Sequence, residues 1–144
     1  MTTSNRYRLS FHVSHPSMSA SEIVASFPFP IRYSRSVGEN RLTKTGRELG
    51  GTYSRTDVSF DVSGGVTFEA NLPLCVCVRD SFDRLPRETI EKVSSTGGEC
   101  FYLIGVYCED NFLVYFSGEL LSLLSSDLIG VKLDIYGGAD VEVD

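Results

Sequence analysis

Ten consecutive residues in the last third of the chain constrain the fold most strongly. They read ECFYLIGVYC from Glu99 to Cys108, and apolar side chains occupy both alternating faces of the run. A strand that is apolar on both faces is typical of the centre of a covered sheet. We therefore expect a central strand here, with the rest of the fold built around it.

Further strands and a helix are expected on either side of this run. Alternation of apolar and polar residues predicts a first strand from Arg6 to Ser14 and a last strand from Val131 to Tyr136. Phe112 to Phe116 is expected to return as the antiparallel partner of the central strand, after a tight turn. Ser117 is the predicted N-cap of a helix with a leucine stripe.

Three more segments carry helical signals. Ser19 and Glu22 have the spacing of a capping box, in which each side chain bonds to the backbone amide of the other residue. Pro86 to Val93 starts with proline and is followed by two glycines, which is typical of a short helix. Leu72 to Arg84 fits a helix with Asn71 as its N-cap, but its apolar residues also alternate as in a strand, so periodicity leaves both structures open.

Length and composition favour one domain over residues 1–144. A chain of 144 residues of which 42% are hydrophobic is sufficient for one ordinary core. The predicted elements give an α+β fold: a two-layer sandwich with a mostly antiparallel sheet of about five strands and helices mainly on one face.

Secretion and membrane insertion are not indicated. The N-terminal residues pass directly into a strand pattern without the basic and apolar regions of a signal peptide, and the apolar runs are too short to cross a bilayer. A core of this size needs no disulfide. The cysteines are Cys75, Cys77, Cys100 and Cys108. We expect reduced thiols in a cytoplasmic protein.

Charges are unevenly distributed along the chain. Residues 1–98 contain 12 Lys or Arg and 10 Asp or Glu, whereas residues 99–144 contain nine Asp or Glu and a single base, Lys132. An acidic surface repels nucleic acid and suits a basic protein partner, although it can also serve solubility alone. The candidate partner-binding residues are Glu109, Asp110, Asp134 and Asp140.

Residues 31–55 form a second charged region. It is rich in glycine and in basic residues, a composition that suits an anion site, and its candidate ligands are Arg41, Lys44 and Arg47. The region lacks the Gly-Lys-Ser/Thr signature of a phosphate loop. Intramolecular ion pairs with the acids of the same region are the structural alternative.

Catalytic and metal-binding patterns are not evident. His12 and His15 are the only histidines, so an enzyme with a histidine base would need one of them beside a serine or cysteine. The cysteines lack paired C-x-x-C spacing, which argues against a structural zinc site. The sequence therefore predicts no catalytic residue, no metal and no cofactor, and leaves enzyme activity open with a preference against it.

Four stretches together resemble one known family. They are HPSMSASEIVASF after the first strand, GENRLTKTGRELGGTY in the basic region, STGGE before the central strand and FSGELLSLLSSDLIGVKLDIYG at the end. In this order they are similar to the bacterial domain of unknown function 4279 family over nearly the whole chain. The resemblance implies a helix over Leu72 to Arg84 and implies no activity. One departure is Thr56-Asp57-Val58, where family members often carry an aromatic pair ending in Trp, because this chain has no Trp.

Taken together, the patterns favour a non-catalytic cytosolic binding protein. The first hypothesis is an inhibitor of the immunity or antitoxin kind that binds a basic toxin domain through the acidic C-terminal half, because opposite charges accelerate association. The alternatives are a small hydrolase and a regulatory module that binds an anionic ligand through the basic region. No membrane or nucleic-acid partner is expected, and the oligomeric state is left open.

Overall fold

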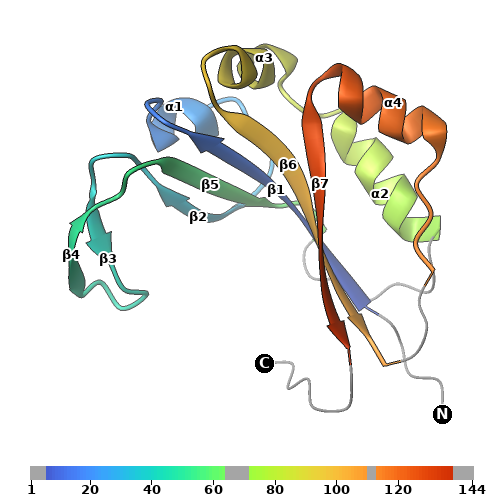
Figure 1. Ribbon diagram of the computed structural model, residues 1–144, viewed down its shortest axis with the longest axis horizontal. Coiled ribbons are helices and arrows are strands. Elements are labelled where there is room, and N and C mark those ends of the chain that lie inside the picture. The colour runs from blue at the N-terminus through green and yellow to red at the C-terminus, as the bar shows by residue number, and fades with distance from the viewer. Residues whose placement is uncertain (1–5, 64–71, 110–112, 138–144) are drawn as a thin grey trace.

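Five strands form a mixed sheet in the order β2-β5-β1-β6-β7 (Figure 1). The structure is a computed structural model, and it describes residues 6–63, 72–109 and 113–137. The elements are β1 (Arg6–His15), α1 (Ala20–Val24), β2 (Ile31–Arg35), β3 (Asn40–Leu42), β4 (Glu48–Thr52), β5 (Thr56–Asp61), α2 (Leu72–Phe82), α3 (Arg87–Ser95), β6 (Glu99–Cys108), α4 (Gly118–Ser126) and β7 (Ile129–Gly137).

Most neighbours in this sheet are antiparallel. β1 pairs with β5 on one side and with β6 on the other, and β2 continues the sheet beyond β5. Among the described strands, only β6 and β7 pair in parallel. The predicted α+β fold with a mostly antiparallel five-stranded sheet is thus confirmed. The placement of the helices mainly on one face and the single domain stay predictions.

The hairpin of β3 and β4 is a separate two-stranded sheet. It projects from the β2–β5 side of the main sheet, away from α2 and α4 (Figure 1). Residues 31–55, the glycine-rich basic region of the sequence, contain β2, β3 and β4. The projection matters for function because every residue of β3 and β4 is exposed.

One predicted strand is wrong. We expected Phe112 to Phe116 beside the central strand, but residues 113–116 have no regular structure, and residue 112 lies outside the described residues. The reason is that β6 already has β1 on one side and β7 on the other. The segment lies against α2 instead, since Cys75 Sγ donates to the carbonyl oxygen of Tyr115 at 2.6 Å.

The core lies on the side of the sheet that carries the odd-numbered residues of β1. Phe11 is fully buried and meets the Tyr102 ring edge-on, with 5.0 Å between ring centroids. The Tyr102 hydroxyl lies 2.7 Å from Oγ of Ser81 on α2, and burial raises the pKa of Tyr102 to about 12. Buried side chains from all four helices join this core. Tyr102 therefore links the central strand to α2.

The predicted helix starts are largely confirmed. The Ser19 hydroxyl accepts from the Glu22 amide, and the Ser117 hydroxyl accepts from the Leu120 amide. The second half of the capping box is absent, because the Glu22 carboxylate pairs with Lys92 of α3 at 2.6 Å. The ambiguous segment is helical as α2, and its proposed cap Asn71 lies outside the described residues. In the described part of the chain, no helix has the length and apolarity to cross a membrane.

Candidate binding surfaces

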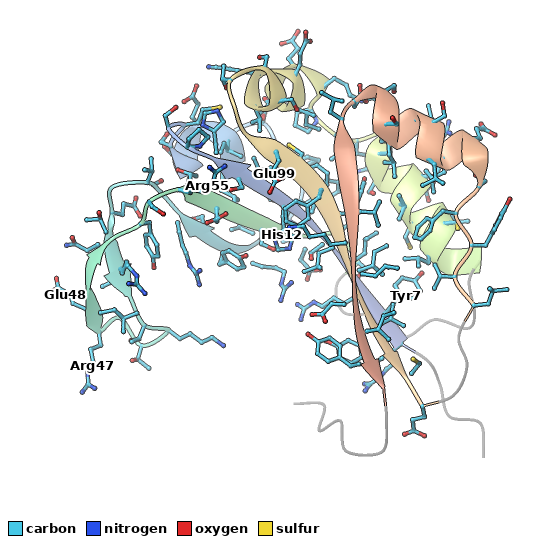
Figure 2. The ribbon with its side chains drawn as sticks, viewed as in Figure 1. Tyr7, His12, Arg47, Glu48, Arg55 and Glu99 are labelled. Atoms are coloured by element: carbon cyan, nitrogen blue, oxygen red, sulfur yellow. The ribbon has the colours of Figure 1, made fainter. Side chains whose placement is uncertain are left out.

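The side of the sheet opposite the core carries a row of polar and aromatic residues. We call it the polar sheet face and define it by the even-numbered residues of β1 and their neighbours. One row crosses four strands, because Tyr33 pairs with Ser59, Ser59 with His12, and His12 with Phe101. His12 therefore lies in the middle of the sheet (Figure 2).

His12 is held as a neutral imidazole. Its ring stacks on Phe101 with centroids 5.1 Å apart, and its Nε2 lies 3.1 Å from the hydroxyl oxygens of both Ser10 and Ser59. Burial, and after it the positive charges of Arg32 and Lys132, lower the pKa of His12 to about 4. The sequence placed His12 on the side opposite the apolar face, and the structure confirms that position.

The two serines beside His12 do not present a nucleophile. A serine and a histidine within hydrogen-bond reach are the start of a catalytic pair, and this arrangement was the basis of the hydrolase alternative. Ser10 is only 1% exposed and Ser59 is fully buried. Both hydroxyls are therefore almost inaccessible to a substrate. The geometry therefore gives the hydrolase alternative no support at this position.

His15 orders the loop that follows β1. Its Nδ1 accepts from the amides of Ser17 and Met18 at 2.9 and 2.8 Å. Its Nε2 lies 2.7 Å from Oγ1 of Thr96, whose hydroxyl donates to the carbonyl of Lys92. These partners require a neutral ring that is protonated on Nε2, and burial lowers the pKa of His15. Both ring nitrogens are therefore used structurally.

The cysteines are dispersed. Cys75 and Cys77 lie on α2, whereas Cys100 and Cys108 lie at the start and end of β6. Cys100 is buried, and burial raises its pKa to about 12. All four thiols are free, and the described residues contain no cluster of three or more His, Cys, Asp or Glu side chains that could hold a metal.

The three candidate anion ligands lie together on the β3–β4 hairpin. Arg41 is on β3, Lys44 lies in the connecting turn, and Arg47 directly precedes β4. All three side chains are exposed, and none forms an ion pair with any acid in the described part of the chain. Gly46 has a φ of 85°, which lets the turn reverse between them. Figure 2 shows Arg47 at the outer end of the hairpin.

The base of the hairpin carries a cationic and aromatic cluster. The Arg35 guanidinium lies over the rings of Tyr33 and Tyr53, at 4.7 and 5.7 Å from their centroids. Arg35 thereby covers one face of each ring. The sequence shows Tyr33 and Tyr53 interleaved with basic residues in this region, but it did not predict that Arg35 contacts both rings. The spacing of Tyr33 and Arg35 by two residues on a strand is the signal that would have placed them on one face.

The candidate acidic residues are not all gathered. Glu109 lies at the end of β6 and Asp134 on β7, and both are exposed. Asp134 accepts a hydrogen bond from the Tyr136 hydroxyl. Asp110 and Asp140 lie outside the described residues.

Two other acids of the C-terminal third are compensated by arginines from earlier in the chain. Glu119 lies 3.8 Å from Arg79 of α2, and Asp127 pairs with Arg87 of α3. The acidity of the C-terminal third, which is segregated in the sequence, is therefore partly neutralised in the fold. The basic hairpin has no such compensation among the described residues.

Comparison with known proteins found no family model that matches the chain, and no match among curated proteins or solved structures.

Proposed function

We propose that the protein is a non-catalytic binding protein that contacts an acidic surface of a partner protein through the β3–β4 hairpin. The observation that carries this proposal is that Arg41, Lys44 and Arg47 are exposed without an acidic partner in the described residues. Unpaired charges on a projecting element accelerate association with a surface of opposite sign.

A protein partner is favoured over nucleic acid. The net charge of −6 opposes any extended polyanion, and a nucleic acid carries a negative charge at every phosphate along its length, whereas an acidic patch of a protein is short enough to meet the hairpin alone. Proteins that bind single-stranded nucleic acid stack the nucleobases on free aromatic rings. Here, Arg35 already covers one face of both Tyr33 and Tyr53. A short acidic segment of a folded protein needs neither a long basic track nor free rings.

The experiment is affinity capture with the tagged full chain from a lysate of the organism that encodes it. The test variant is Arg41→Gln with Lys44→Gln and Arg47→Gln. The matched control adds the same change of charge elsewhere, as Ser95→Glu with Ser122→Glu and Ser125→Glu, which are exposed positions on α3 and α4. The proposal predicts that one acidic protein is captured by wild type and control but is lost with the hairpin variant. Equal capture by all three chains would contradict it.

A second candidate is the inhibitor of a basic toxin domain that the sequence suggested. It is supported by Glu109 and Asp134, which are exposed and have no ion pair in the described residues. The compensation of Glu119 and Asp127 by arginines weakens its charge argument. If the captured protein is basic, and if Glu109→Lys with Asp134→Lys releases it while the hairpin variant retains it, this candidate replaces the first.

A further inference from the structure

Strand β7 is a long edge of the main sheet. It bonds to β6 along one side, and no described strand pairs with its other side. Its nine residues keep an unbroken register with β6. Leu133 is 48% exposed and Ile135 is 64% exposed. An edge strand of this kind presents unpaired backbone N–H and C=O groups that another strand can use.

The opposite edge of the sheet shows what a protected edge looks like. β2 has five residues, and its register with β5 shifts between Ile31 and Tyr33. Short length and a bulge both discourage the addition of a further strand. β7 has neither device, and it contains no proline. The two edges of this sheet are therefore not equivalent.

The charges of β7 are complementary to those of a second β7. In an antiparallel pair centred on Leu133, Lys132 of one copy lies opposite Asp134 of the other, and this happens twice because the pair is symmetric. Val131 then lies opposite Ile135 of the second copy, and Leu133 lies opposite itself. Cross-strand pairs of opposite charge and of apolar residues both stabilise a sheet.

A change of register removes this complementarity. Moving the centre by one residue places Asp134 opposite itself, and like charges in that position are destabilising. Both charged side chains are available for the favourable register. Lys132 lies 3.9 Å above the Phe101 ring, Asp134 accepts from Tyr136, and neither forms an ion pair in the described residues.

Symmetry also keeps like faces together. The two-fold axis of such a pair is perpendicular to the sheet, so each copy places the polar sheet face on the same side. Val131 belongs to the partly buried surroundings of the core, and α4 packs on β7. The apolar residues of β7 from both copies would then form one continuous apolar strip.

We propose that the protein forms an isologous dimer by antiparallel pairing of β7 with β7 of a second copy, in the register that places Lys132 opposite Asp134. The two five-stranded sheets become one continuous sheet of ten strands. The hairpins lie beyond β2 and β5, at the two far ends of that sheet, so dimerisation leaves both hairpins free.

Charge reversal tests the register. Asp134→Lys places two lysines opposite one another, and Lys132→Asp does the same with two aspartates. Sedimentation analysis over a concentration series should show a wild-type dimer and a dissociation constant that is weaker by roughly tenfold or more for each variant. An equimolar mixture of the two variants restores opposite charges at every position and should dimerise like wild type. Melting curves of each variant confirm that it is folded.

Three results would overturn the proposal: a monomeric wild type, a dissociation constant that neither single substitution changes, and a mixture of the two variants that does not associate. A monomer that instead takes up a strand of another protein on β7 belongs to the first case.

Cross-linking gives a second and independent readout. Leu133→Cys brings two thiols together across the axis, since opposed residues in antiparallel strands have a Cα separation of about 4.5–5.5 Å, which a disulfide can bridge. Ile135→Cys is the control, because it lies opposite Val131. Mild oxidation should link the first variant and leave the second at the level of wild type. Equal linking of both variants would contradict the register.

Discussion

Nε2 of His15 lies 2.7 Å from Oγ1 of Thr96, and this contact joins the end of β1 to the end of α3. The two residues are more than 80 positions apart from each other in the chain. The other ring nitrogen accepts from two backbone amides. A single buried side chain therefore forms hydrogen bonds with the loop after β1 and with the end of α3. This structural role accounts for a histidine in this position without a catalytic one.

Removal of this side chain should destabilise the fold. His15→Ala leaves the amides of Ser17 and Met18 without their acceptor and opens a cavity, so we expect the free energy of unfolding to fall by about 2–4 kcal/mol. Thr96→Val removes only one partner and should cost about 1 kcal/mol. Urea denaturation measures both. A loss below about 0.5 kcal/mol for His15→Ala would show that the loop does not depend on the ring.

Acid should weaken the fold through both histidines. Burial lowers the pKa of His12 to about 4 and lowers the pKa of His15 as well, whereas an unfolded histidine has a pKa of about 6.5. The unfolded chain therefore binds more protons below pH 6.5, and stability is lost as the pH falls from about 6.5 toward 4.

The slope of the free energy of unfolding against pH shows which histidine is responsible for the loss. His12 contributes up to about 1.4 kcal/mol per pH unit in that window, and His15 contributes in the same direction. His12→Gln should reduce the slope between about pH 6.5 and pH 5, before most carboxylates titrate. Denaturation curves at a series of pH values test this. The assignment fails if the variant keeps the wild-type slope.

Gly98 is a position where only glycine fits. A Cβ built there lies 2.6 Å from Cδ2 of His15, and 2.7 Å from both the Ser14 carbonyl oxygen and Val93 Cγ1. Gly98→Ala should cost about 1–3 kcal/mol, because β1 and α3 must separate. Gly118→Ala is the matched control, since nothing lies within 4 Å of its Cβ. Similar melting temperatures for the two variants would contradict the close packing.

The sequence predicted those strands and helix starts that depend on the spacing of neighbouring residues. Alternation in β1 and the cap at Ser117 both follow from neighbouring residues, and both are confirmed. The parallel pairing of β7 with β6 could not be predicted in this way, because it depends on how α4 returns the chain to the sheet. The missing strand over residues 113–116 has the same origin, since its place beside β6 was already taken.

The binding surfaces were predictable only in part. The basic residues of the hairpin are close in sequence, and they lie on one hairpin in the structure. The acidic C-terminal third was different, because Arg79 and Arg87 come from helices earlier in the chain and compensate Glu119 and Asp127. Counting charges along the chain cannot detect pairs that only tertiary structure creates.

The central claim is that the β3–β4 hairpin is the contact surface for an acidic protein. Its most direct test is a titration of the captured partner against wild type and against the variant in which Arg41, Lys44 and Arg47 are replaced by Gln, at low and at high salt. We expect binding that is about tenfold weaker for the variant at low salt, with a difference that shrinks as salt screens the exposed charges. An equal dissociation constant for both chains at low salt would contradict the claim.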